Sequence, residues 1–526
     1  MDGLVTTGLD QDAVAGAVVV IVSGDRVLLS KGYRLADARS GQQMTPEDSV
    51  VPLASVTKVF TALAVLRLAR EGRLALNDPI TRHLTELKLD QRFGDIRIIH
   101  LLSHTAGLED RYRGYFADHG KRVDMSVQDR ISAVLPAQVR PPEDVISYSN
   151  ASFVLLGAIV AQVSGQSFET YLAESVLAPL GVTTPRFMHE HHDTGVISPF
   201  HVWKAGRYKA VDPDPFPAIH TPSGGLALTG TDVKRVMQAL LKEGAEAAGA
   251  VPVEKAIADL QHAAWPGRRA FAGRTLGFWT EIWAGQQVFH HGGTHFGFHT
   301  HLTLVPALDI GIFVAANGPN GSSLMALPRR VLREIVAPME RPAAKRVTCD
   351  RVCLEPYQGR YITTRRNETG LDRILAPYQT AFTVASMEDN ALLVSGLSHS
   401  RRFEAIGADG FESPEGDTRL GFRRDDNGHI TGAYLNGGIH SFDRLGFWHT
   451  AASLDSALWT ALTGSVLCLA GAGIGHRSRQ RILRFPLWQG LLWIGISVGF
   501  VAILERIGQD HDPSRQVTPG SGMWAM

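Results

Sequence analysis

The sequence predicts an α+β protein, with an antiparallel sheet flanked by helices and an all-helical subdomain, followed by a small antiparallel β-barrel and a transmembrane helical hairpin. Three observations lead to this fold class. β-rich runs stand at both ends of a mostly helical first part, short β-rich runs alternate with turn residues further on, and two long uncharged segments lie near the C-terminus. We therefore divide the chain into residues 1–336, 346–446 and 454–506, with a polar tail at 507–526.

The composition describes a globular body without a pronounced charge. The chain has 526 residues, of which 44% are hydrophobic and 20% charged, and its formal net charge is zero. A chain of this length exceeds one common core, so a large domain with smaller units is expected. The balanced charge gives no reason to expect a nucleic acid as partner.

The first part begins with strands and continues with helices. Two β-rich runs flank Ser23-Gly24-Asp25, which is typical of a hairpin. Apolar residues then recur at helical spacing from Ser55 to about Glu71, which predicts a helix buried on one broad face. Further apolar helical stretches occupy 152–163 and 231–241.

β-type residues return at 288–317, where a turn at 306–309 predicts another hairpin. Because strands occur at both ends of the first part, we expect them to meet in one sheet, with the domain ending near Ile335. Residues 338–345 have the composition of a linker. From Tyr357 to Leu445, alternating short runs and turns predict a small antiparallel barrel or sandwich.

Two uncharged segments, 457–475 and 487–504, are close to membrane-spanning length, so a lipid bilayer is an expected partner. Buried core helices are the alternative. The loop between them is basic, which places it in the cytoplasm and the body outside, in the periplasm or on the cell surface. Because residues 1–14 lack the pattern of a signal peptide, a body on the cytoplasmic side is the alternative.

The three cysteines, Cys349, Cys353 and Cys468, form neither a disulfide framework nor a metal motif. A Cys349–Cys353 bridge is conceivable in an oxidising compartment, but we expect unpaired cysteines. The spacing of the histidines in "HEHHD", residues 189–193, favours solvated side chains over metal ligands. No metal and no cofactor are expected.

Ser55 and Lys58 are the first candidates for chemistry. At positions i and i+3 they share a helix face, and burial with positive neighbours would let a neutral lysine accept the serine proton. Alone, the pair is better explained as a helix cap and a surface charge. Tyr148-Ser149-Asn150, on a loop entering a helix, and His291-Gly292-Gly293-Thr294, on a predicted strand, reverse that judgement.

In this order, the three elements resemble the serine β-lactamase and penicillin-binding-protein family, in its class C-like and esterase/D-peptidase branches. The resemblance covers about Gly16 to Ile335 and includes "IRIIHLLSHTAGL", "YSNASFVLLGAIV", "PSGGLALTGTDV" and "HHGGTHFGFHTHLTLVP". It implies a β-lactamase-like fold for the first domain, and we expect the barrel that follows to be lipocalin-like.

The resemblance also implies roles. Ser55 would attack a carbonyl carbon, Lys58 and Tyr148 would share its proton, and Asn150 would bond both Lys58 and a substrate amide. Backbone N–H groups of Ser55 and Thr294 would form the oxyanion hole.

His291 is the fifth expected catalytic residue. It replaces the family's more familiar lysine opposite a substrate carboxylate, so positive charge at this position would depend on pH. Gly292, Gly293 and His295 are expected to line the cleft. Tyr112 is expected there too, with a packed surface lid as the alternative, and His104 is expected to be a structural, hydrogen-bonded residue.

The sequence thus predicts a membrane-anchored serine hydrolase that cleaves a small-molecule or peptide substrate, through a Ser55 acyl-enzyme. Peptides, amides and esters are all candidates, including those with D-residues. One alternative is an acyltransferase or peptide cyclase that releases a nonribosomal peptide, which would suit a cytoplasmic body. The other is a module that binds or senses a peptidoglycan fragment without turnover.

Overall fold

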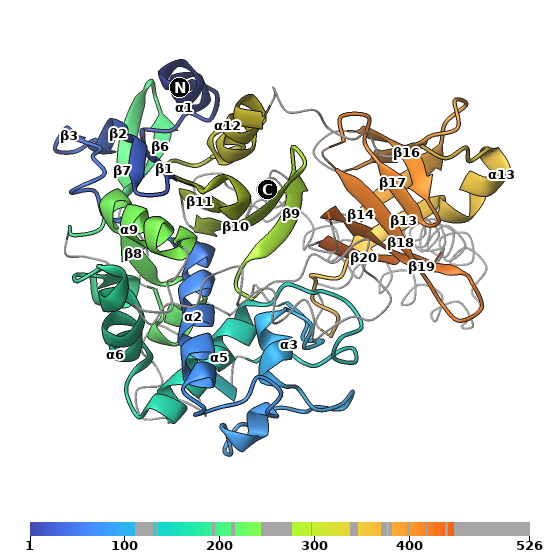
Figure 1. Ribbon diagram of the computed structural model, residues 1–526, viewed down its shortest axis with the longest axis horizontal. Helices are drawn as coiled ribbons and strands as arrows, with labels where there is room; N and C mark the ends of the chain where they lie inside the picture. Colours follow the sequence, from blue (N-terminus) through green and yellow to red (C-terminus); the bar gives the residue numbers. More distant parts are fainter. Residues whose placement is uncertain are drawn as a thin grey trace, which may run out of the picture.

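A computed structural model of the chain describes residues 1–110, 131–132, 135–191, 195–211, 216–242, 276–295, 297–336, 346–369, 376, 381–396, 400–416, 418–436 and 440–446 (Figure 1). Within these ranges, the first part of the chain forms an α+β domain and the second a closed barrel. Figure 1 shows the barrel, in orange, beside the sheet of the first domain.

A seven-stranded antiparallel sheet, in the order β3-β2-β1-β12-β11-β10-β9, is the centre of the first domain. The predicted hairpin around Gly24 is confirmed, because β1 and β2 are antiparallel neighbours and Gly24 has a φ of 54°. Strand β1 pairs on its other side with β12, so the two ends of the first part meet as expected. The strands are β1 (Gly16–Ser23), β2 (Arg26–Asp37), β3 (Gln42–Gln43), β9 (Trp279–Trp283), β10 (Gln286–His295), β11 (Phe298–Val305) and β12 (Ile310–Asn317).

The segment after residue 288 contains more turns than the sequence predicted. The hairpin at 306–309 is present, with the 3-10 turn η8 (Pro306–Leu308) between β11 and β12. A second reversal, with Gly297 at a φ of 77°, separates β10 from β11. His295 therefore ends one strand while His299 and His301 lie on the next, so the two strands of the hairpin predicted over 288–317 are three in the structure, β10, β11 and β12. A side chain at 297 would meet the Phe200 ring, so glycine suits this turn.

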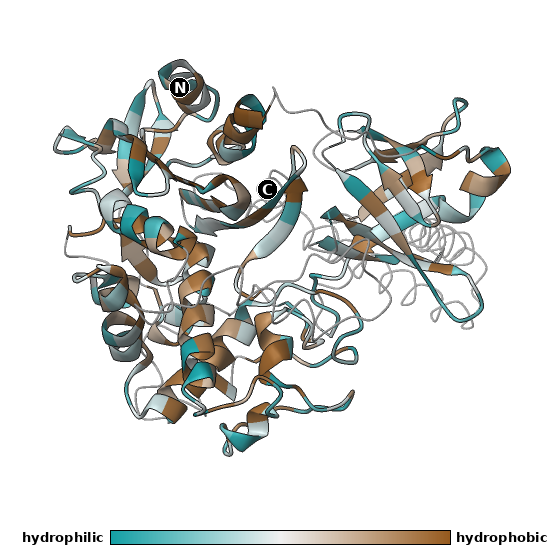
Figure 2. Cartoon of the chain, in the orientation of Figure 1, coloured by the Kyte–Doolittle hydropathy of each residue, from teal (hydrophilic) through white to brown (hydrophobic). Residues whose placement is uncertain are grey.

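The sheet is buried on both faces. Val18 and Val20 of β1 pack in the core cluster formed with α2, α5 and α9, whereas Val19 and Ile21 pack with α1 and α12. Figure 2 shows the hydrophobic residues gathered on these helices and the strands between them. The predicted helices are confirmed as α2 (Thr57–Arg70), preceded by the 3-10 turn η1 (Ala54–Val56), α5 (Asn150–Ser164) and α9 (Gly230–Leu241).

Shorter elements complete the first domain. The helices are α1 (Asp2–Gln11), η2 (Ile80–Arg82), α3 (Ile98–Leu102), α6 (Phe168–Tyr171), η3 (Leu172–Leu177), η4 (Ala178–Leu180), α7 (Met188–His191), η5 (Ala218–His220), α8 (Thr221–Gly224), α11 (Ser322–Met325) and α12 (Leu327–Val336). The small sheets are β4 (Val51–Pro52), β8 (Leu226–Leu228) and β5 (Arg186–Phe187), and the pair β6 (Phe200–Lys204) and β7 (Arg207–Val211).

Eight antiparallel strands close into a barrel in the second part, because β13 pairs with both β14 and β20. Its interior is largely aromatic, with Tyr361 stacked on Phe382. The elements are α13 (Arg351–Leu354), η9 (Glu355–Tyr357), β13 (Gly359–Thr363), β14 (Ala381–Ser386), β15 (Leu392–Ser395), β16 (Arg401–Gly407), β17 (Gly410–Glu412), β18 (Arg419–Arg424), β19 (Ile430–Leu435) and β20 (His440–Arg444).

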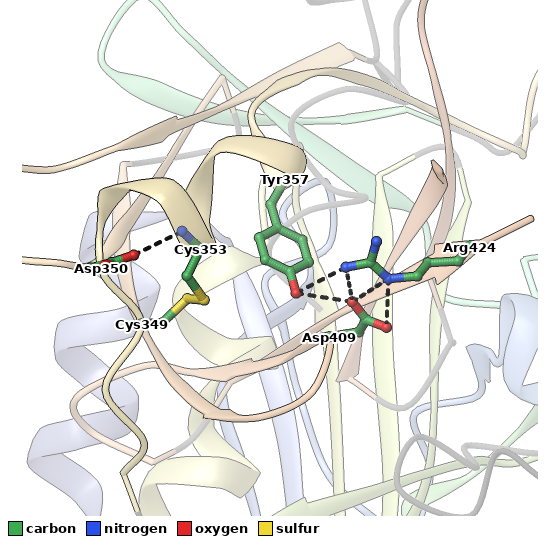
Figure 3. The surroundings of a disulfide bond; sticks show 6 residues. All are labelled: Cys349, Asp350, Cys353, Tyr357, Asp409 and Arg424. Atoms are coloured by element: carbon green, nitrogen blue, oxygen red, sulfur yellow. Dashed lines mark hydrogen bonds and ion pairs between the residues drawn. A yellow bond between two sulfur atoms is a disulfide. The ribbon is translucent and has the colours of Figure 1, made fainter. Parts of the chain in front are cut away.

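Cys349 and Cys353 form a disulfide at the start of the barrel, so the expectation that they are unpaired is wrong (Figure 3). Asp350 caps α13 by accepting a hydrogen bond from Cys353 N at 2.9 Å, and this turn brings the two Cα atoms to 5.3 Å. Nearby, Tyr357 donates to Asp409, which also pairs with Arg424.

The two predicted membrane spans, 457–475 and 487–504, lie outside the described residues. Within the described ranges, no single helix combines the length and apolar character needed to cross a bilayer. Among the described helices, α5 and residues 168–180 meet these requirements only when taken together, as a pair bent by 79°.

Candidate active site

Ser55 lies in η1, one turn before α2, rather than in α2 itself. The residue before it, Ala54, has a φ of 47°, a left-handed conformation that costs an alanine about 1–2 kcal/mol. Such strain persists where the surrounding packing imposes it, and it is concentrated at functional sites. Here it turns the chain from β4 into α2, with Ser55 at the bend.

Lys58 is completely buried, and its Nζ lies 3.1 Å from Ser55 Oγ. Nζ also donates to the carbonyl of Ser223, on α8. Burial, reinforced by the positive charge of Arg365, holds the pKa of Lys58 well below its usual value. A neutral amine beside a serine hydroxyl can act as a general base.

Tyr148 approaches the same oxygen from the loop before α5, and its hydroxyl donates to Ser55 Oγ at 2.9 Å. Burial raises the pKa of Tyr148 to about 12, although Arg365 opposes the shift. Tyr148 is therefore a phenol at neutral pH, while Lys58 is the group inclined to accept a proton.

Asn150 begins α5, directly after Ser149, whose hydroxyl caps the helix by accepting from Ser152 N. The expected bond from Asn150 to Lys58 is not among the described contacts. Lys58 Nζ donates instead to the Ser223 carbonyl, which lies in the "PSGG" segment.

His291 lies on β10, and only 2% of its surface is exposed. Its Nδ1 donates to the Gly292 carbonyl at 2.6 Å, and its ring centroid lies 5.9 Å from that of Trp279. Burial, with Lys58 nearby, lowers the pKa of His291 to about 3. The ring is thus neutral across the physiological range, which corrects the expectation of a pH-dependent charge at this position.

Gly293 allows β10 to run directly against η1. A Cβ at this position would lie 2.4 Å from the Leu53 carbonyl oxygen and 2.5 Å from Thr300 Oγ1. Thr300 itself donates to the Leu53 carbonyl at 2.8 Å, which ties the sheet to the turn that carries Ser55. Thr294 follows on the same strand, so the oxyanion hole formed by the Ser55 and Thr294 N–H groups stays a prediction consistent with this packing.

The other predicted cleft residues are less central. His295 is buried against Phe216, with ring centroids 5.1 Å apart, and burial lowers its pKa to about 3. Tyr112 lies outside the described residues.

Three contributors to the site were missed by sequence reasoning. Trp279 of β9 stacks 5.7 Å from Tyr148, and the Arg365 guanidinium, from the barrel, lies 4.5 Å from the centre of the Tyr148 ring. Asp110 binds Arg365 Nε at 2.6 Å. No motif surrounds them that could have identified them.

His104 has the structural role that was expected. Its Nδ1 accepts from Ser149 N at 3.2 Å, and its ring lies 4.4 Å from that of Tyr148. Its φ of 55° is a second left-handed backbone position beside the site. His104 therefore holds the Tyr148 loop in place.

Comparison with known proteins identifies relatives of the first domain. A family model described as "Beta-lactamase" matches residues 1–337. Protein flp of Staphylococcus aureus strain N315 is 32% identical over 190 residues, which are 36% of this chain and 38% of that protein. The chain thus spans about two-fifths of the length of the Flp proteins it matches. Esterase EstB of Burkholderia gladioli is 30% identical over 278 residues, 46% of this chain and 69% of EstB.

Solved structures share the fold over a greater length. SurE has a TM-score of 0.57 and 22% identity, covering 84% of this chain and 98% of SurE. The octameric penicillin-binding protein homologue from Pyrococcus abyssi has a TM-score of 0.54 and 20% identity over the same shares.

Proposed function

This chain belongs to the beta-lactamase family, as a serine hydrolase of that fold, and from this premise we propose that it cleaves a peptide, amide or ester through a Ser55 acyl-enzyme. The observation that carries the proposal is the convergence on Ser55 Oγ of Lys58 Nζ at 3.1 Å and the Tyr148 hydroxyl at 2.9 Å.

These two contacts to Ser55 Oγ support the following order of proton transfers. Neutral Lys58 takes the Ser55 proton as Oγ attacks the carbonyl carbon, and Tyr148 donates its proton as the bond to the leaving group breaks. The protonated Lys58 restores the Tyr148 phenol. Water then attacks the acyl carbon, and the bond from that carbon to Ser55 Oγ breaks. One proton of the water passes to Ser55 Oγ, which restores the serine and releases the acid.

A neutral His291 favours substrates without a strict requirement for a carboxylate at that position, such as esters, amides and peptides, including those with D-residues. Acyl transfer to an amine, or cyclisation of a nonribosomal peptide, is the second candidate. EstCE1, described as a hydrolase with promiscuous acyltransferase activity, shares the fold at a TM-score of 0.52 and 23% identity, over 63% of this chain and 96% of its own. Adding amine acceptors and measuring how product divides between acid and amide separates the two.

We place the protein at a membrane, through segments 457–475 and 487–504, with its body outside the cytoplasm. The Cys349–Cys353 disulfide supports this side, because disulfides persist in oxidising compartments. Protease treatment of intact cells tests it: full protection of the body would overturn the outward orientation.

A fluorophosphonate probe followed by intact-mass measurement tests the hydrolase. We expect one adduct on the wild type, none on Ser55→Ala, and an unchanged adduct on Ser40→Ala, which removes an exposed serine. A wild type without an adduct would favour the alternative of a binding or sensing module.

A further inference from the structure

A side chain of the barrel enters the catalytic array of the first domain. Arg365 follows β13, and its guanidinium lies over the Tyr148 ring, 4.5 Å from the ring centre. Lys58 Nζ is also near that ring, at 5.0 Å. The amine of Lys58 and the guanidinium of Arg365, which come from different domains, therefore border the group that contacts Ser55.

The loop that carries Arg365 is held firmly against the residues before Tyr148. Thr364 Oγ1 donates to the Ile146 carbonyl at 3.1 Å, and Ser147 Oγ donates to the Thr364 carbonyl at 3.0 Å. Asp110 N donates to the Arg366 carbonyl at 3.1 Å. The loop thus docks through its backbone on both sides of Arg365.

Asp110 fixes the direction of the Arg365 side chain. Its carboxylate, only 4% exposed, accepts from Arg365 Nε at 2.6 Å. A buried carboxylate paired with a partly buried guanidinium is a strong, directional contact. The pair brings one charge of each sign next to the catalytic groups.

We propose that Arg365 is a positioning residue for Tyr148 and Lys58, so that the barrel completes the active site of the first domain. This inference rests on the proposed hydrolase for its kinetic consequence, but the effect of Arg365 on the Tyr148 phenol does not depend on turnover.

The charges around Lys58 determine the direction in which each substitution should shift its pKa. Arg365 opposes protonation of Lys58 and lowers its pKa, whereas Asp110 raises it. The same two residues act on the pKa of Tyr148 in the same directions. His104 and His291 also face Lys58, and burial holds the pKa of each below its ordinary value, so both are neutral at pH 7.

Removing the positive charge and removing the negative charge should therefore displace the pH profile of kcat/KM in opposite directions. Arg365→Gln leaves Asp110 unbalanced and raises the Lys58 pKa, so the acidic limb of kcat/KM against pH should move up by roughly one unit. Asp110→Asn should move it down. Arg365→Lys, which keeps the charge, should restore part of the wild-type profile, and the double variant should lie near the wild type.

Arg366→Gln is the matched control. Arg366 belongs to the same docked loop and pairs with Asp443 at 2.9 Å, but it is not among the groups acting on Lys58 or Tyr148. It should lower the melting temperature without moving the limb. Equal displacement in Arg365→Gln and Arg366→Gln, or displacement of the same sign in Arg365→Gln and Asp110→Asn, would overturn the proposal.

A second measurement needs no substrate. A fluorotyrosine placed at position 148 of the full chain ionises at lower pH than tyrosine, and its ¹⁹F shift reports the titration directly. We expect a higher midpoint in Arg365→Gln and a lower one in Asp110→Asn. Unchanged midpoints would reject the proposal even if Ser55 is a nucleophile, while displaced midpoints with no fluorophosphonate adduct would retain it and reject only the hydrolase.

Discussion

The Tyr148 hydroxyl donates a 2.9 Å hydrogen bond to Ser55 Oγ across a separation of 93 positions in the sequence. Lys58 reaches the same oxygen from within the helix that follows Ser55. Ser55 Oγ thereby contacts both the amine that we propose as its base and a phenol from a distant part of the sequence. Each of these contacts can be tested separately.

Tyr148→Phe removes the phenolic proton while keeping the ring that lies close to both Arg365 and Lys58. Loss of a positioned general acid should lower kcat by about 10²–10⁴-fold. The fluorophosphonate adduct should still form, because Lys58 remains. Tyr208→Phe, which loses a phenolic bond to the Val14 carbonyl, is the control and should keep full activity. Equal rates for Tyr148→Phe and the wild type would remove Tyr148 from the mechanism.

Lys58→Met should abolish activity and change how stability depends on pH. The pKa of Lys58 is lowered in the folded state, so between that value and 10.5 the unfolded chain binds more protons. Wild-type stability should therefore rise with pH through this window, by at most about 1.4 kcal/mol per unit. Urea denaturation at several pH values should show Lys58→Met as relatively more stable at neutral pH, with the difference shrinking toward pH 10. A difference independent of pH would contradict the buried neutral amine.

His291→Asn should retain activity near neutral pH, since the ring it replaces is uncharged there. With a folded pKa of about 3 against 6.5 when unfolded, His291 makes the wild type lose stability as pH falls below 6.5. The slope is about 1.4 kcal/mol per unit for one group, and the variant should lack it. Thermal melts at pH 7, 6 and 5 measure the difference. If the melting temperatures of the wild type and the variant fall equally with pH, the pKa of His291 is not lowered in the folded state.

Gly293→Ala should impair both folding and catalysis, because the added Cβ would overlap the Leu53 carbonyl and Thr300. We expect a loss of about 1–3 kcal/mol in unfolding free energy, with a lower kcat as β10 moves away from η1. Gly407→Ala is the control, since a Cβ there meets nothing within 4 Å. If both variants have the same melting temperature, the close approach of β10 to η1 is not required for stability.

The sequence predicted those features that local patterns encode. The β1–β2 hairpin, α2, α5 and α9 follow from periodicity and turn residues, and the order of the motifs brought Ser55, Lys58 and Tyr148 together correctly. Arg365 and Asp110 could not be found in this way, because their contact depends on how two domains dock. The reversal at Gly297 was missed since β-type residues continue on both sides of it.

The cysteines and His291 show a different limit. Whether Cys349 and Cys353 pair depends on the α13 turn that brings them together, and spacing alone does not specify such a turn. The charge of His291 depends on burial by Tyr148, Trp279 and the strand itself, which the motif does not encode.

Ion pairs between oppositely charged side chains contribute to the contacts between the two domains. Asp110, Arg140 and Asp144 of the first domain pair with Arg365, Asp443 and Arg423 of the barrel. A substitution that reverses one of these signs puts like charges together unless its partner changes as well. A barrel taken from a distant relative should therefore dock on this domain only if its charges match those of the surface it meets.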